Sequence, residues 1–399
     1  MNIKISNRME PLNPSAIREM LKYTALPGVI SFAAGGPSPE MYPGEDLRRI
    51  SDRLYAEGCS SFLQYGATEG YGPLRNTVKE RLKNKYSAGS GDDDLIILTG
   101  GQQGMDLAVK CLCNDGDTII CESPTFIGAL NCFRSYRAHI VGMPMDADGM
   151  DVDALEAALK KEKNVKLIYT ICDFQNPMGV TLSLERRKRI YELACKYDVM
   201  IYEDNPYFEL RYSGDHVPLI KSMDTQGRVI FGGSVSKIIA PGLRIGFTLA
   251  RADLIQKMVV AKQICDVHTP LYTQMLVDAY MTECDLDGHI AQARDLYRRK
   301  RDCMISLMDE LFPSNVPFTR PNGGLFIWFD LPDGLSGKDF SEFAAKKGVA
   351  CVPGSAFDLN EDPSNPGVRL NFSVPSFEQI ESGIKTLSEC LKQFTSQRS

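Results

Sequence analysis

The sequence predicts an α/β protein with a largely parallel sheet, joined to a smaller α+β unit. From about residue 95 onward, short apolar runs alternate with amphipathic ones, which is typical of repeated strand–helix units. Distinctive polar residues follow the ends of several of these runs, where α/β sheets bind their ligands. After about residue 288, a long helical stripe and two separate strand-like runs replace the alternation.

The elements of the larger unit follow from these patterns. The apolar runs predict buried strands at 95–99, 118–121, 166–171, 199–202 and 228–231. A turn at Gly100-Gly101 leads into a helix that continues through Val109, and another helix is expected around 127–133. Ser183 is a predicted N-cap, with Glu185 in the first turn of its helix.

The smaller unit is expected to contain a long helix whose apolar stripe runs from Ile290 to Leu311. Strands are expected at 323–329 and 368–373, and the Pro/Gly-rich segment within the first 45 residues predicts a loop. We therefore expect two domains. Residues 46–287 would form the large one, and the small one, with a mobile N-terminal segment, would combine 1–45 and 288–399.

Composition excludes several classes of function. The 399 residues are 43% hydrophobic and 24% charged, as in ordinary soluble proteins, and no apolar run is long enough to span a bilayer. A net charge of −6 argues against a nucleic-acid partner. The N-terminus does not resemble a secretory signal and the 12 cysteines form no CxxC pair, so we expect reduced thiols and a cytoplasmic protein. The four histidines lack metal-ligand spacing, so no metal site is expected.

The most informative stretch of the chain surrounds Lys237. Ser234 and Ser236 precede this lysine in a Gly-rich run, and Arg244 follows it seven positions later. An amine beside hydroxyls and a guanidinium suits a cofactor that carries both an aldehyde and a phosphate. A lysine near serines is by itself more often a solvated surface charge, so the hypothesis depends on partner residues elsewhere in the chain.

Candidate partners follow other predicted strands. Asp204 could face a protonated ring nitrogen, and Tyr207 and Asn176 could hydrogen-bond a phenolate oxygen of the same ring. Gly101 and Gln102 open a helix whose backbone N–H groups could bind a phosphate. Each has an ordinary alternative: a turn or cap for Asp204, an Asn-Pro turn for Asn176, and a tight turn at the glycines.

Two further residues could complete such a site. Phe126 could stack on the face of a pyridine ring, although a phenylalanine there is more often part of the core. Arg369, in a predicted strand, could form a bidentate pair with a substrate carboxylate. The alternative, a solvent-facing arginine, is equally open from the sequence.

The ordered motifs resemble those of the fold-type I, pyridoxal-phosphate-dependent aminotransferases of class I/II. The likeness is to the branch that contains 2-aminoadipate (LysN-type) and kynurenine aminotransferases and the MocR-like regulators. It extends over nearly the whole chain and rests on four segments: 15–22 with 29–33, 63–66 with 69–71, 175–179 and the Lys237 run.

The resemblance implies a seven-stranded, mostly parallel sheet and a role for each candidate. Lys237 would form the Schiff base with the cofactor and carry the proton, and Arg369 would bind the α-carboxylate with Gly36 nearby. Tyr65 would reach the phosphate of the neighbouring subunit, which implies a homodimer with shared sites. The remaining cofactor contacts would come from Gly101, Gln102, Phe126, Asn176, Asp204, Tyr207, Ser234, Ser236 and Arg244.

The expected activity is that of an aminotransferase (EC 2.6.1.-) in amino acid metabolism. It would move an amino group from an L-amino acid to a 2-oxo acid, 2-oxoglutarate for instance, by a ping-pong mechanism. The donor could be 2-aminoadipate, an aromatic or another amino acid. Arg18 resembles a position that can meet an acidic substrate side chain, although a solvated helix face explains it equally well.

Other functions remain open from the sequence. A different pyridoxal-phosphate reaction, such as β-elimination, would use the same scaffold. A ligand-sensing MocR-like regulator is less favoured, because no basic recognition helix precedes the fold. A nicotinamide dehydrogenase is a less favoured function still, because no GxGxxG follows a strand.

The chain also departs from the resembled family at two positions. Many relatives have Ser at the position of Gly101 and often Tyr at that of Phe126.

Overall fold

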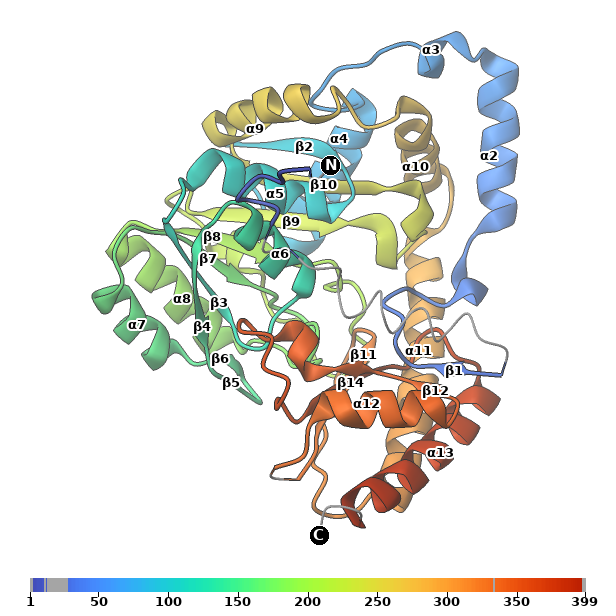
Figure 1. Ribbon diagram of the computed structural model, residues 1–399. Coiled ribbons are helices and arrows are strands. Elements are labelled where there is room, and N and C mark those ends of the chain that lie inside the picture. The colour runs from blue at the N-terminus through green and yellow to red at the C-terminus, as the bar shows by residue number, and fades with distance from the viewer. Residues whose placement is uncertain (1–2, 11, 13–27, 333, 397–399) are drawn as a thin grey trace.

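The protein is described by a computed structural model that covers residues 3–10, 12, 28–332 and 334–396. Its main feature is a seven-stranded sheet in the order β2-β10-β9-β8-β7-β3-β4 (Figure 1). Strand β10 is antiparallel to both of its neighbours and the other pairs are parallel. The sheet is therefore mostly parallel, as predicted, although the strand at 245–251 and its direction were not predicted. The strands are β2 (Asp93–Thr99), β3 (Thr118–Glu122), β4 (His139–Met143), β7 (Val165–Thr170), β8 (Met200–Asp204), β9 (Val229–Ser234) and β10 (Ile245–Arg251).

The sheet is covered by helices on both faces because successive side chains of a strand point to opposite sides. Ile168 and Ile201 pack in one apolar cluster, whereas their neighbours Leu167 and Tyr202 pack in another. The first cluster includes residues of α7 (Val152–Lys161) and α8 (Leu184–Tyr197). The second includes residues of α4 (Gly72–Tyr86), α5 (Gly101–Leu112), α6 (Ile127–Ser135), α9 (Ala252–Cys265) and α10 (Leu271–Glu283).

A smaller unit lies beside the large sheet (Figure 1). Its three-stranded antiparallel sheet has the order β11-β14-β13, and β1 pairs in parallel with β12. These strands are β1 (Ile30–Ser31), β11 (Phe326–Asp330), β12 (Val349–Ala350), β13 (Val352–Pro353) and β14 (Gly367–Asn371). Its helices are α11 (Leu286–Leu311), α12 (Gly337–Lys346) and α13 (Phe377–Ser396).

Short elements complete the fold. They are the hairpin of β5 (Met145–Asp146) and β6 (Gly149–Met150), the helices α2 (Gly44–Glu57) and α3 (Ser60–Leu63), and five 3-10 turns: η1 (Pro39–Met41), η2 (Ile220–Met223), η3 (Val235–Lys237), η4 (Pro241–Leu243) and η5 (Gly354–Phe357). Among the described helices, none combines the length and apolar character needed to cross a bilayer.

Most predicted elements are present within a few residues of their expected bounds, and Ser183 caps α8 by accepting a hydrogen bond from the backbone of Arg186. One strand starts later than predicted, because β11 begins at Phe326 and not at residue 323. Gly324 has a φ of 71°, and a side chain there would collide with Phe174, so this glycine belongs to a close-packed turn. The domain division at residues 45 and 287 remains our proposal. Its second boundary falls within the first turn of α11, which begins at Leu286.

Candidate active site

A cavity of about 330 Å³ opens at the carboxyl ends of β8 and β9. This is the edge of an α/β sheet at which ligands are expected to bind. All of the predicted site residues line it except Tyr65, Gly36 and Arg18: Gly101, Gln102, Phe126, Asn176, Asp204, Tyr207, Ser234, Ser236, Lys237, Arg244 and Arg369. The tertiary structure therefore brings together residues from both units of the chain.

Lys237 ends the 3-10 turn η3, directly after β9. Its Nζ donates a hydrogen bond to the carbonyl oxygen of Gly35 at 2.8 Å. Burial lowers the pKa of Lys237 to about 8, and the charges of Arg369 and Arg244 act in the same direction. About a tenth of this amine is therefore uncharged at pH 7, far more than for an ordinary lysine, and the uncharged form is the one that acts as a nucleophile or base.

Asp204 is the last residue of β8, and its Oδ2 accepts a hydrogen bond from the Tyr169 hydroxyl at 2.7 Å. Burial raises the pKa of Asp204 to about 6, and the bond from Tyr169 opposes this rise. The carboxyl group is thus mostly ionised at neutral pH, and a cationic partner would stabilise the ionised form further. Neither the cap nor the simple turn that the sequence left open describes this residue.

One end of the cavity, which we call the buried end, is formed by Arg369 and Asn176. Arg369 is 1% exposed, and its guanidinium carbon lies 4.3 Å from the ring centre of Phe326 and 5.0 Å from that of Phe357. It donates to Asn176 Oδ1 at 2.9 Å, which leaves the Asn176 amide nitrogen as the group free to donate. The Arg369 Nε is buried without an acceptor, and burial lowers the pKa of the group to about 10, so it stays cationic at neutral pH.

The opposite end, which we call the helix end, is formed by Gly101, Ser234, Ser236 and Arg244. Helix α5 begins at Gly101, so its unpaired backbone N–H groups lie at the cavity. The Ser234 hydroxyl donates to Ser236 Oγ at 2.8 Å, and Arg244 donates to the carbonyl of Thr99 at 3.2 Å. Gly100 has a φ of 83°, a backbone conformation that favours glycine, and the Arg244 guanidinium lies against it.

Three predicted residues lie elsewhere. Tyr65 is 78% exposed and packs edge-on against His268, outside the cavity of its own chain. Gly36 accepts a hydrogen bond from Ser373 Oγ at 2.8 Å, while its neighbour Gly35 lines the cavity. Arg18 falls outside the described residues, as does most of the expected mobile N-terminal segment.

Sequence reasoning missed Tyr169, which holds Asp204, and the two rings that enclose Arg369. Tyr169 belongs to the apolar run of a central strand, so the sequence predicts only a core residue there, and it is in fact fully buried. Phe326 and Phe357 lie in separate C-terminal elements, and nothing in their spacing links them to residue 369. An arginine in a strand with no neighbouring acidic residue was the only available signal.

The sequence is similar to those of known aminotransferases. The family model "Aminotransferase class I and II" matches residues 38–387. The chain is 42% identical over 386 residues to aromatic-amino-acid aminotransferase 1 of Thermococcus litoralis, covering 96% of this chain and 92% of that protein. It is 36% identical over 384 residues to the 2-aminoadipate transaminase of Thermus thermophilus, covering 96% and 94%.

A solved structure agrees with the sequence comparisons. The crystal structure of kynurenine aminotransferase from Pyrococcus horikoshii, in complex with PMP, superimposes with a TM-score of 0.94 at 41% identity, covering 98% of this chain and 97% of that one. These matches confirm the predicted fold and the resemblance. The chain belongs to the class I and II family of pyridoxal-phosphate-dependent aminotransferases, and it is an aminotransferase.

Proposed function

We propose that the cavity holds pyridoxal phosphate, with the phosphate at the helix end, the ring nitrogen at Asp204 and the aldehyde at Lys237. The observation that carries this proposal is the position of the Lys237 amine in one cavity with an ionised acid and a separate set of anion-binding groups. When bound, this cofactor supplies an aldehyde that accepts amino groups and a ring that withdraws electrons from the substrate Cα.

The residues at the helix end suit a phosphate, because a helix N-terminus, hydroxyl groups and a guanidinium all interact favourably with an anion. Phe126 lines the cavity at the start of α6 and offers an aromatic face to a flat ring. Asp204 would keep a ring nitrogen protonated because the two charges stabilise each other. Tyr207 and the free amide nitrogen of Asn176 offer donors to a ring oxygen.

In the reaction, Lys237 would move the proton to and from the substrate Cα. The uncharged form of Lys237 can accept this proton, and its lowered pKa makes that form available. Arg369 lines the cavity and would hold the α-carboxylate with its cationic guanidinium, and so orient Cα before the proton moves. Because this arginine is cationic and enclosed, it favours substrates that keep their carboxylate.

Borohydride reduction of the cofactor-loaded protein, followed by peptide mapping, tests the assignment of the lysine. Reduction makes the cofactor–lysine bond permanent, so the added mass should appear on the peptide that contains Lys237. Modification of a different lysine would contradict the proposal even if the protein remained active.

We propose a broad range of amino donors, including aromatic amino acids, kynurenine and 2-aminoadipate, with 2-oxoglutarate as acceptor. The names of the similar enzymes support the three classes of donor. A panel of donors at fixed 2-oxoglutarate, compared by kcat/KM, tests the range. Selectivity for a single donor by more than about a thousandfold would contradict a broad range.

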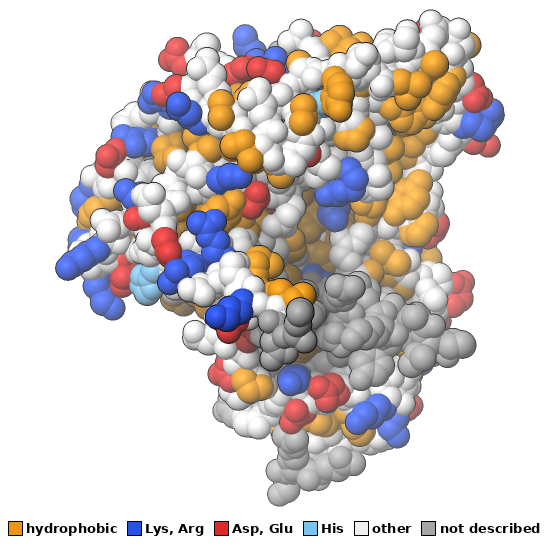
Figure 2. Space-filling view, turned by 45° about the horizontal axis from the view of Figure 1, so that its top comes forward, with side chains coloured by type: hydrophobic (Ala, Val, Ile, Leu, Met, Phe, Trp, Pro, Cys, Tyr) orange, Lys and Arg blue, Asp and Glu red, His pale blue; other side chains and the backbone are white. Residues whose placement is uncertain are grey.

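We also propose that two copies form a homodimer in which Tyr65 reaches the site of its partner. Leu63, Tyr65 and Ile264 are each at least two-thirds exposed, and Val267 nearby is 45% exposed. Figure 2 shows apolar side chains gathered on this upper part of the surface. Exposed apolar side chains in this number are typical of an interface.

Mixing two variants tests the shared site. A heterodimer of Lys237→Ala and Tyr65→Ala subunits carries one site in which both residues are intact, so the two variants refolded together should bind the cofactor more tightly and turn over faster at limiting cofactor than the same variants refolded apart. Absence of this gain, with dimers confirmed by light scattering, would contradict the shared site without affecting the role of Lys237.

A further inference from the structure

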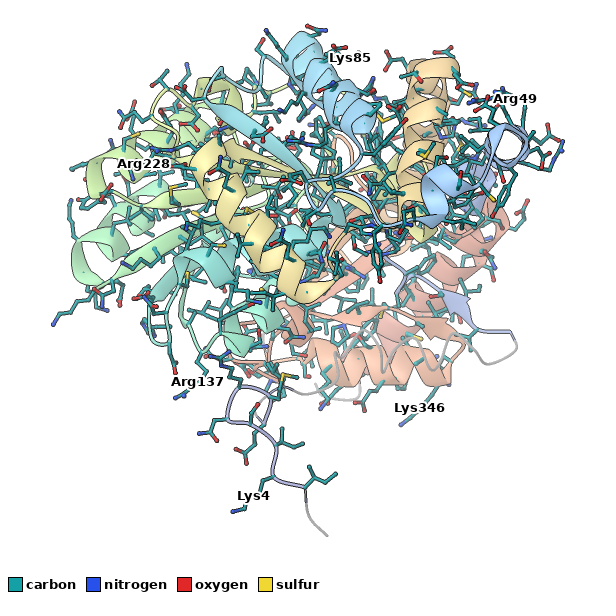
Figure 3. All side chains as sticks on the ribbon, turned by 90° about the horizontal axis from the view of Figure 1, so that it is seen from above. Lys4, Arg49, Lys85, Arg137, Arg228 and Lys346 are labelled. Atoms are coloured by element: carbon teal, nitrogen blue, oxygen red, sulfur yellow. The ribbon has the colours of Figure 1, made fainter. Side chains whose placement is uncertain are left out.

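A second cavity, of about 360 Å³, lies apart from the Lys237 cavity. It shares no lining residue with the active site, yet both are built on one segment: Tyr207 lines the active site and Phe208 lines the second cavity. Lys85, near the end of α4, is one of its lining residues, and Figure 3 labels its position on the surface. We call this second cavity the basic pocket, because Lys85, Arg211 and Arg294 line it, together with His216.

The basic pocket has more positive charge than its neighbours neutralise. Arg211 and the fully buried Arg187 share one carboxylate, Asp173, at 3.2 and 3.0 Å. Arg294 donates from Nε to the backbone carbonyl of Glu209 at 2.7 Å, and no carboxylate pairs with it in the described part of the chain. Two guanidinium groups are therefore incompletely neutralised at this cavity.

Hydrogen bonding is also incomplete there. The Arg211 side chain is 10% exposed, and its Nε is buried without an acceptor. Its guanidinium is held 4.8 Å from the ring centre of Phe174, so the group is fixed in place rather than free in solvent. Because this Nε is closed off from solvent, an anion in the basic pocket would meet the fixed guanidinium through its Nη groups, one of which already donates to Asp173.

The remaining wall is aromatic. The ring of Tyr86 lies 4.8 Å from that of Phe208 and 5.2 Å from that of His216, both in edge-on contact. Burial lowers the pKa of His216, and the charges of Arg211 and Arg294 contribute to this effect. His216 is therefore neutral at pH 7 and available to donate or accept one hydrogen bond.

We propose that the basic pocket binds a small organic anion. Its carboxylate or phosphate group would lie between Arg211 and Arg294, and a flat apolar part would pack on Tyr86 and Phe208. Arginine suits both anionic groups, since its fork matches two oxygens at once. The inference goes beyond the proposed transamination and does not depend on it.

Histidine NMR on the cofactor-loaded protein tests this proposal, because the chain has only four histidines. The probes are phenyl phosphate and benzoate, added at pH 7 and constant ionic strength. Either probe should shift the ring signal of His216 in a saturable way, and the one that binds more tightly identifies the preferred anionic group. The signal of the exposed His139 on β4 should stay in place.

Variants separate binding in the basic pocket from other effects. Arg294→Gln should raise the Kd read from His216 by at least about tenfold, the worth of one charged hydrogen bond. Arg298→Gln is the matched control on the same helix, since Arg298 pairs with Asp295 and does not line the basic pocket. If Arg294→Gln fails to fold, Lys85→Gln should raise the same Kd by roughly two- to threefold, as expected of a partly exposed charge.

The proposal is overturned if neither probe moves the His216 signal at millimolar concentration. It is equally overturned if Arg294→Gln binds the probes as tightly as the unaltered protein. A loss of transaminase activity alone would concern the Lys237 cavity and would leave these outcomes unchanged.

Discussion

The helix end and the buried end of the active-site cavity each contain an arginine, but the surroundings of the two differ. Arg244 is exposed and is held by the backbone carbonyls of Pro241 and Thr99. Arg369 is enclosed between two aromatic rings and bonded to Asn176. Solvent already stabilises the charge of Arg244, whereas Arg369 has lost its water and depends on protein groups.

This difference determines how much binding is lost when a contact at each end is removed. A bond to the enclosed guanidinium is made in a low-dielectric setting, so losing it costs more than losing an exposed one. The helix end compensates with several weaker donors, since backbone N–H groups and two hydroxyls act together. We expect substrate choice to depend on the buried end and cofactor retention to be shared among many groups at the helix end.

The largest effect on activity is expected from a substitution of Lys237, which lines the same cavity as the residues of the two ends. Lys237→Ala should lower kcat by on the order of 10⁴, because it removes the group that moves the proton. Steady-state assays with a saturating donor measure this, and the exposed Lys338→Ala serves as the control. Turnover that survives the substitution would mean that another group carries the proton.

Arg369→Gln should lower kcat/KM on the order of a thousandfold, the cost of breaking a buried charged contact. Arg369→Lys should recover part of this loss, because it restores the charge but not the fork. Cofactor content, read from absorbance, should change little in either variant. A loss of cofactor equal to the loss of activity would show that the two ends are not independent.

The pH dependence of cofactor capture tests the environment of Lys237. Only the uncharged amine attacks an aldehyde, and the pKa of Lys237 is lowered to about 8. The capture rate of the cofactor-free protein should therefore level off above pH 8 and fall by about fiftyfold from pH 8 to pH 6. Stopped-flow absorbance measures the rate.

Arg369→Gln sharpens this test, because the charge of Arg369 helps to lower the pKa of Lys237. The midpoint of the profile should move to higher pH in this variant. If the unaltered protein instead shows a midpoint near the pKa of an ordinary lysine, burial does not lower the pKa of Lys237.

The smallest effect is expected at the helix end. Arg244→Gln should weaken cofactor binding by about tenfold, since an exposed charged contact contributes little more than 1 kcal/mol. At saturating pyridoxal phosphate, kcat should stay close to that of the unaltered protein. Equilibrium dialysis gives the affinity, and a thousandfold loss would show that Arg244 is as essential as Arg369.

The residues of the helix end could be predicted from the sequence more easily than those of the buried end. Gly101, Ser234, Ser236 and Arg244 lie in or next to short Gly-rich motifs, so local turn chemistry indicates where they are. Arg369 and Asn176 are 193 positions apart and meet through packing between the two units. From the sequence, Arg369 was as easily explained as a solvent-facing residue, although it is almost completely buried.

The sequence by itself determined the alternation of strands and helices, the Lys237 motif and the placement of polar residues after the strands. Burial and turn chemistry leave local, periodic signals of this kind in a chain. Only the tertiary structure decided that Tyr169 holds Asp204, that two rings enclose Arg369 and that Arg211 and Arg294 meet in a second cavity. These contacts join segments far apart in the chain, and no local pattern specifies which buried side chains touch.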